Sequence, residues 1–154
     1  MTTSQQPRKI VVGVDGSPSS EQALRWAVRQ AKLSGDELHV VTSWAMPNTA
    51  YEWGVVAVDI DWAENAQTTQ DRALEETLAE TEAGTVHRHV VQGHPAYALL
   101  ETATAADLLV VGSRGHGGFA GMLLGSVSQH VIAHAPCPVV VVRHDEHSAA
   151  ETDS

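Results

Sequence analysis

Two short segments rich in glycine and serine carry the residues best suited to chemistry. Gly112-Ser113-Arg114-Gly115 is followed, after nine residues, by Gly125-Ser126-Val127-Ser128. A glycine backbone can approach a ligand closely, and the N–H groups at a helix N-terminus attract anions. The two segments therefore predict a site for a phosphate group, and we expect a phosphorylated small molecule, a nucleotide, as its ligand.

The sequence around these segments supports a phosphate site. Residues 108–111 form an apolar run that predicts a buried strand, and residues 126–135 have the pattern of a helix. Ser126 or Ser128 is expected to cap that helix, and Arg114 is the local cation. The alternative interpretation is that the glycines simply form turns, with residues 115–123 as a flexible interaction surface.

The pattern differs from two common phosphate-binding motifs. No lysine follows the last glycine, as a Walker A loop requires. The dinucleotide fingerprint Gly-x-Gly-x-x-Gly belongs in the first strand–helix turn, where this chain has Gly13-Val14-Asp15-Gly16-Ser17. Without the lysine, backbone amides and the hydroxyls of Ser126 and Ser128 are expected to recognise much of the phosphate.

Asp15 lies in the first strand–helix turn and is the candidate for contacts on the opposite side of the ligand. A carboxylate there can hold a ribose hydroxyl or a Mg²⁺ ion. The alternative is structural, because aspartate side chains commonly accept hydrogen bonds from the backbone of such turns.

The order of the predicted elements indicates an α/β fold with an open five-stranded parallel sheet and helices on both faces. Strands are expected at residues 10–14, 38–44, 86–91, 107–111 and 138–142, and helices at 18–34, 63–83, 95–105 and 126–135. Ligands of such sheets bind beyond the carboxyl ends of the strands, where the strand order reverses. The Asp15 turn and the Gly112 segment therefore lie at the same edge of the sheet.

One domain is expected at residues 8–143, between a flexible N-terminus at 1–7 and an acidic flexible tail at 144–154. Residues 45–62 contain helix breakers together with large aromatic residues. This segment is predicted to be either a lid or an ordinary surface loop.

The chain has 154 residues and a formal net charge of −10. This charge disfavours nucleic acid and anionic membrane surfaces as partners, because both require clustered lysine and arginine. A single cysteine, Cys137, and a polar N-terminus without a signal-like apolar run lead us to expect a cytoplasmic protein. We interpret Cys137 as a buried packing residue.

The histidines give weaker signals. His130 and His134 are four residues apart on a predicted helix, and His87 and His89 share one strand face. A structural zinc site usually needs four ligands, so we interpret all four as surface or capping residues.

With these motifs in hand, the chain resembles the universal stress protein family over residues 8–143. The pattern Gly112-x2-Gly115-x9-Gly125-Ser126 matches the family's nucleotide-binding motif. Residues 11–17 look like its opening strand and turn, and residues 135–142 are similar to its closing strand. The resemblance is to single-domain, ATP-binding members. It implies a Rossmann-like, adenine nucleotide α-hydrolase-like fold, bound ATP often with Mg²⁺ or Mn²⁺, and a homodimer formed through residues 138–142.

The resemblance also implies a role for each matching residue. Asp15 would contact ribose or the metal ion, and Thr42 or Ser43 would offer backbone atoms to adenine. The other implied ligand contacts are Gly13 and Val14 at adenine, Val111, Gly112, Arg114 and Gly115 at ribose and phosphates, and Gly125, Ser126, Val127 and Ser128 at the phosphates.

The leading hypothesis is an ATP-binding regulatory or stress-response module with little or no hydrolysis. The enzyme alternative is a slow ATPase or phosphotransferase, for which Asp15, Arg114 and His116 are the available residues. Rapid phosphoryl transfer needs a positioned base and strong cationic stabilisation, so we expect a binding module rather than an enzyme. A third hypothesis, an electron-transfer module binding AMP or a flavin dinucleotide, lacks an evident flavin environment.

Overall fold

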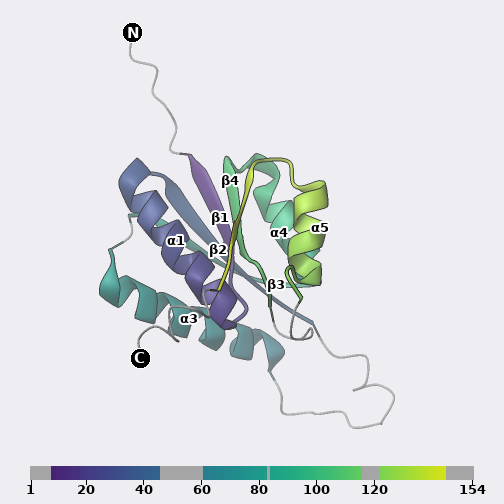
Figure 1. The fold of residues 1–154 in the computed structure, drawn as a ribbon. Helices are drawn as coiled ribbons and strands as arrows, with labels where there is room; N and C mark the ends of the chain where they lie inside the picture. Colours follow the sequence, from purple (N-terminus) through teal and green to yellow (C-terminus); the bar gives the residue numbers. More distant parts are fainter. Residues whose placement is uncertain (1–7, 46–60, 83, 116–121, 145–154) are drawn as a thin grey trace, which may run out of the picture.

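The computed structural model describes residues 8–45, 61–82, 84–115 and 122–144, and Figure 1 shows their arrangement. The strands are β1 (Lys9–Gly13), β2 (Glu37–Trp44), β3 (Val86–Gln92), β4 (Leu108–Gly112) and β5 (Val139–Val142). The helices are α1 (Pro18–Ser34), α3 (Trp62–Glu80), α4 (Pro95–Thr102), α5 (Ser126–His134) and the short 3-10 helix η1 (Ala103–Ala105). Residues 46–60 of the segment predicted at 45–62 as a lid or surface loop, both expected flexible ends except residue 144, and His116 lie outside the described residues.

The five strands form one parallel sheet in the order β3-β2-β1-β4-β5, which confirms the predicted fold class. From β1 the chain first builds outward through β2 to β3, and then crosses back to β4 and β5 on the other side. The strand order therefore reverses between β1 and β4. The Asp15 turn and the Gly112 segment follow these two adjacent strands.

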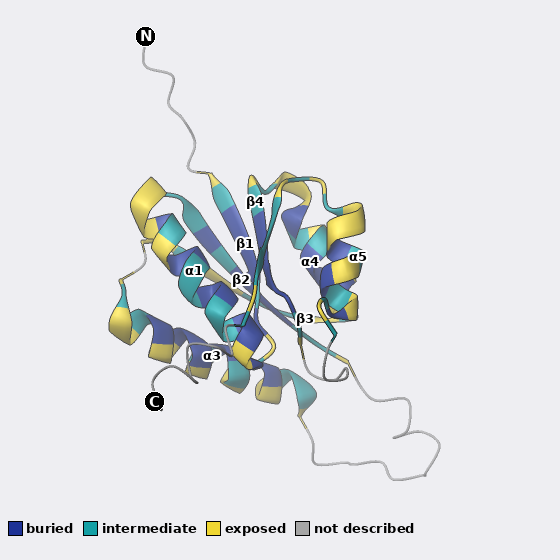
Figure 2. Cartoon of the chain, in the orientation of Figure 1, coloured by how far each residue is buried: buried dark blue, intermediate teal, exposed yellow. Residues whose placement is uncertain are grey.

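Helices cover both faces of the sheet, with α1 and α3 on one side and α4 and α5 on the other (Figure 1). Alternate strand residues are buried toward the two layers: Val12 and Val110 pack with α1, and Val11 and Val111 pack with α4 and α5. Because both faces are buried, the central strands are continuous apolar runs rather than alternating ones. Figure 2 shows this burial concentrated along the middle of the sheet.

Helix α1 has the ends that the sequence predicts. Ser17 is the N-cap, and its hydroxyl oxygen accepts a hydrogen bond from the Ser20 N–H at 3.3 Å. Pro18 occupies the first turn, and Gly35 ends the helix in the left-handed conformation at φ 77°. These caps hold α1 in place directly after the Asp15 turn.

Several predicted boundaries were wrong by a few residues. The helix predicted at 63–83 begins at Trp62, because Asp61 accepts a hydrogen bond from the Glu64 N–H, and it ends at Glu80, where Thr81 is extended. The helix predicted at 95–105 ends at Thr102 and continues as η1. None of these shifts moves the elements around the pocket described below.

Gln70 is a buried residue that the sequence pattern did not predict. It is 1% exposed in the buried stripe of α3, beside Ala73 and Leu74. Its amide nitrogen lies 3.2 Å from the Val40 carbonyl oxygen, 3.1 Å from Thr42 Oγ1 and 3.0 Å from the His89 carbonyl oxygen. Because buried polar groups need hydrogen-bond partners, these contacts make Gln70 a link between α3 and the middle of β2 and β3.

No helix in the described parts of the chain combines the length and apolar character that crossing a membrane would need.

Candidate functional site

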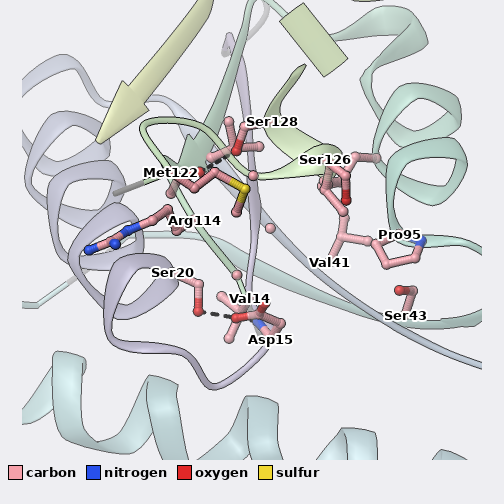
Figure 3. Close-up of a pocket in the computed structure, with 17 residues that line it drawn as sticks. Val14, Asp15, Ser20, Val41, Ser43, Pro95, Arg114, Met122, Ser126 and Ser128 are labelled. Atoms are coloured by element: carbon pink, nitrogen blue, oxygen red, sulfur yellow. Dashed lines mark hydrogen bonds between the residues drawn. The ribbon is translucent and has the colours of Figure 1, made fainter. Parts of the chain in front are cut away.

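A pocket of about 440 Å³ lies at the carboxyl edge of the sheet, where β1 and β4 end (Figure 3). All twelve predicted contact residues line it: Gly13, Val14, Asp15, Ser43, Val111, Gly112, Arg114, Gly115, Gly125, Ser126, Val127 and Ser128. The sequence did not predict five further lining residues, which are Ser20, Val41, Pro95, Leu99 and Met122. Its volume falls within the range of roughly 300 to 1,000 Å³ typical of small-molecule sites.

The β1–α1 turn holds Asp15 in a defined position. Asp15 Oδ1 accepts a hydrogen bond from the Ser17 N–H at 2.9 Å and another from the Ser17 hydroxyl. The Asp15 N–H donates to Ser20 Oγ at 3.2 Å, and Gly16 completes the turn at φ 84°. Asp15 therefore has the structural role that the sequence offered as the alternative, because its side chain accepts hydrogen bonds within the turn. Its side chain is nevertheless exposed and lines the pocket.

Gly112 lies where β4 passes closest to α1. A Cβ atom on Gly112 would be only 2.7 Å from the backbone carbon and oxygen of Ser19, so no larger residue fits without moving the helix. The contact continues along the chain, because the Arg114 N–H donates to Ser19 Oγ at 3.2 Å. The end of β4 is thus held against the start of α1.

Backbone hydrogen bonds fix the two ends of the loop that follows β4. The Ser113 N–H donates to the Val142 carbonyl at 2.8 Å, which attaches the loop to β5. The Gly125 N–H donates to the Ser113 carbonyl at 2.6 Å, which brings the two glycine segments together. The two glycine segments, which nine residues separate in the sequence, therefore meet at one wall of the pocket.

The predicted serine cap of α5 was wrong. Gly125 occupies the N-cap position, with φ −72° and ψ 165°, and no side chain caps the helix within the described residues. Because Gly125 takes the cap position, Ser128 lies one turn into the helix, and its hydroxyl donates to the Gly112 carbonyl at 2.5 Å. Ser126 is exposed and lines the pocket. The first turn of α5 borders the pocket. No capping side chain among the described residues accepts a hydrogen bond from the N–H groups of this turn.

The opposite end of the pocket is apolar. Val41 and Val111 come from β2 and β4, Val14 directly follows β1, and α4 adds Pro95 and Leu99. Gly13 gives Leu99 room, because a Cβ atom at that position would lie 3.0 Å from both Leu99 methyl carbons.

Of the two candidates at the end of β2, Ser43 lines the pocket and Thr42 does not. Thr42 is buried on the other face of the sheet, where it is bonded to Gln70. The predicted contact at this strand end therefore falls on Ser43.

Two charged side chains line the described pocket, Asp15 and Arg114. In Figure 3 Arg114 extends toward α1, away from Ser126 on the other side of the view. Asp15 lies at the β1 end, next to Val14. The described lining thus combines an apolar end, one carboxylate, one guanidinium and a glycine-rich wall.

Cys137 lies just before β5 and does not line the pocket. It is partly exposed rather than fully buried, which corrects the expectation from the sequence. Burial, and to a lesser extent the negative charge of Asp107, raises the pKa of its thiol. The thiol form therefore predominates at neutral pH, as expected for a packing residue.

The fold and the pocket define a class of α/β protein whose ligand site lies at the switch point of a parallel sheet. Comparison with known proteins gives the family. The model of the universal stress protein family matches residues 7–143, and the chain belongs to this family.

Individual relatives agree with this assignment. A universal stress protein of Mycolicibacterium smegmatis is 42% identical over 142 residues, which are 87% of this chain and 45% of that protein. The chain thus spans about half the length of the curated relatives it matches.

Solved structures support the fold. The universal stress protein UspA from Lactobacillus plantarum has a TM-score of 0.74 at 23% identity, with 90% of this chain and 99% of that chain covered. A universal stress protein solved in complex with cAMP has a TM-score of 0.61 at 32% identity, covering 90% and 98%. The fold is accordingly the Rossmann-like, adenine nucleotide α-hydrolase-like one of these proteins.

Proposed function

We propose that this chain is an ATP-binding regulatory or stress-response module that hydrolyses its nucleotide slowly or not at all. The observation that carries the proposal is the pocket at the β1–β4 switch point, which all twelve predicted contact residues line. A related protein of the same fold is described in complex with cAMP, which supports an adenine nucleotide as the ligand class.

The two ends of the pocket suit the two ends of a nucleotide. Val14, Val41 and Leu99 offer an apolar surface for a base, and Ser43 adds a polar group beside it. At the other end, the glycine-rich wall and the uncapped first turn of α5 suit a phosphate chain. The ribose would then lie between them, near Asp15 and Gly112.

The residues present also fit a metal ion carried by the nucleotide. Mg²⁺ prefers oxygen ligands and is commonly bound by one or two carboxylates together with substrate phosphates. Asp15 supplies such a carboxylate, and its Oδ2 points to the Gly115 side of the pocket, where a Cβ atom would approach it to 2.7 Å. We propose Asp15 as the residue that would hold Mg²⁺ or Mn²⁺, or a ribose hydroxyl.

Binding without rapid turnover is favoured by the charges in the pocket. Among its described lining residues, only Arg114 is a cation, and no lysine accompanies it. Asp15 Oδ1 already accepts two hydrogen bonds from Ser17, which limits its use as a general base. Fast phosphoryl transfer requires stronger cationic stabilisation and a positioned base.

We also propose that the protein forms a homodimer through β5. This strand lies at the edge of the sheet and consists of four valines, each partly exposed. An apolar edge strand presents unpaired backbone groups that a second copy can bond.

Nucleotide extraction from the purified protein tests the proposed ligand. We expect ATP to co-purify, to be identified by native mass spectrometry, and to remain uncleaved over hours of incubation. Preparations that carry no adenine nucleotide and bind none by calorimetry would contradict the binding proposal. Conversion to ADP within minutes would instead support the ATPase alternative.

A further inference from the structure

A second cluster of ligand-type side chains lies on β2 and β3, outside the nucleotide pocket. Glu37 and His39 are two residues apart on β2, and His87 and His89 are two apart on β3. Residues two apart on a strand point to the same face. The parallel register places His39 directly beside His87, so the four side chains gather on one face of the sheet.

Three of these side chains present their ligand atoms to one another. Glu37 Oε2 lies 3.6 Å from His39 Nε2 and 3.7 Å from His87 Nε2. One ligand atom from each of the three residues lies within 4.8 Å of the other two. The rings of His39 and His87 are stacked, with centroids 4.4 Å apart.

His39 is oriented by a hydrogen bond from its other ring nitrogen. His39 Nδ1 lies 2.9 Å from His89 Nε2. The His39 side chain is only 12% exposed. Its Nε2 atom is buried and has no hydrogen-bond partner among the described residues. When Nδ1 carries the proton and donates a hydrogen bond to His89, Nε2 keeps a lone pair 3.6 Å from a carboxylate oxygen of Glu37. Two electron-rich atoms then face each other, and a cation between them would satisfy both.

The surroundings of His39 favour its neutral form. Burial lowers the pKa of His39, and the positive charge of Lys9 on the neighbouring strand lowers it further, although Glu37 opposes these effects. The pKa of His89 is lowered for the same two main reasons. Neutral imidazole is the form that binds metal ions.

We propose that Glu37, His39 and His87 form a binding site for a divalent transition metal ion, with Zn²⁺ as the probe. A Zn–N distance of about 2.1 Å implies ligand separations of roughly 3.4 Å in a tetrahedral site. The two measured separations, 3.6 and 3.7 Å, are already close to this value. His89 acts as a positioning residue, because its Nε2 can accept the hydrogen bond from His39 Nδ1–H that leaves Nε2 of His39 free to bind.

The ligand set determines which ions fit. Two imidazoles and one carboxylate suit Zn²⁺, Ni²⁺ or Cu²⁺, whereas Mg²⁺ and Ca²⁺ prefer oxygen ligands. The positive charge of Lys9 repels any cation at this site, so only metal ions that coordinate strongly are expected to bind. Three protein ligands leave a fourth position for water.

Such an ion would join the edge strand β3 to β2. It would stabilise the folded chain, because the three ligands are brought together only by folding. The site uses residues outside the pocket.

Calorimetric titration of the full chain with Zn²⁺, after removal of metals with EDTA and dialysis, tests the proposal. We expect one equivalent to bind, and His87→Ala and Glu37→Gln each to weaken binding by at least about tenfold. His134→Ala is the matched control, because His130 and His134 form the other stacked histidine pair, with centroids 4.5 Å apart. This control should keep the zinc affinity of the unchanged chain.

Thermal unfolding provides a second readout. Zn²⁺ should raise the melting temperature of the unchanged chain and of His134→Ala, but not that of His87→Ala or Glu37→Gln, and Mg²⁺ should raise none of them. Melting without metal shows whether each variant is folded. Absence of zinc binding by the unchanged chain, equal affinity in His87→Ala and Glu37→Gln, or loss of binding in His134→Ala would each overturn the proposal.

Discussion

Asp15 and Gly115 lie next to each other in the lining of the candidate nucleotide pocket, in the segments that follow β1 and β4. A Cβ atom on Gly115 would lie 2.7 Å from Asp15 Oδ2. The two residues are one hundred positions apart in the sequence and meet because β1 and β4 are neighbouring strands. A side chain at position 115 would therefore intrude on the carboxylate and on the space beside it.

Replacing Gly115 with valine should weaken ATP binding by at least about tenfold, or about 1.4 kcal/mol, without unfolding the chain. The added side chain would collide with the Asp15 carboxylate inside the pocket. Calorimetric titration with ATP measures the affinity. Gly84→Val is the matched control, because position 84 has no atom within 4 Å of an added Cβ and lies outside the pocket. An unchanged affinity in Gly115→Val would reject the assignment of this loop.

The two serines at the start of α5 should respond differently to substitution by alanine. Ser126→Ala should weaken ATP binding and leave the free energy of unfolding unchanged, because Ser126 is exposed in the pocket. Ser128→Ala should lower the free energy of unfolding by about 1 kcal/mol, because it removes a buried hydrogen bond to Gly112. Urea unfolding and ATP titration of both variants separate the two roles. If both variants showed the same pattern, the structural distinction between these serines would fail.

The sequence allowed the fold and the polar end of the pocket to be predicted, because both depend on local patterns. A strand, a glycine segment and a helix start are all visible in a short window around Gly112. The contribution of α4 to the pocket was missed, because the order of the strands in the sheet determines that Pro95 and Leu99 lie there, and this order is not visible in a short stretch of sequence. The cluster at His39 was missed for a related reason: its ligands lie on two strands, and only their register brings His39 and His87 together. The predicted cap of α5 was wrong because Gly125, Ser126 and Ser128 are all residue types found at helix N-caps, and Gly125 occupies that position.

Asp15→Asn should reduce the dependence of ATP binding on Mg²⁺. Asparagine keeps a side-chain oxygen that can accept the hydrogen bond from the Ser17 N–H, so the turn is preserved while the charge is removed. ATP affinity measured with Mg²⁺ and with EDTA should differ in the unchanged chain and differ less in the variant. The same affinity under both conditions, in both proteins, would remove the proposed metal role of Asp15.

The proposed dimer predicts a position on β5 that should be sensitive to proline. Pro138 and Val142 direct their carbonyls to β4, so by alternation Val141 directs its backbone groups to the free edge. Val141→Pro removes the N–H group on that edge and should yield a monomer by light scattering, whereas Val141→Thr keeps the N–H and should remain dimeric. Circular dichroism verifies that both variants are folded. A monomeric mass for the unchanged chain at micromolar concentration would contradict the proposal.

Cys137 should react slowly with alkylating reagents, with a pH midpoint above that of a free cysteine. Burial and then the charge of Asp107 raise the pKa of its thiol, and only the thiolate is nucleophilic. The alkylation rate should therefore rise with pH and level off only above the midpoint of a model thiol. Asp107→Asn removes the negative charge but keeps an oxygen for the hydrogen bond from the Lys9 N–H. This variant should lower the pH midpoint of alkylation, but not as far as the midpoint of a free cysteine, because burial is the larger cause of the raised pKa. A midpoint at or below that of free cysteine would show that the thiol is activated rather than simply packed.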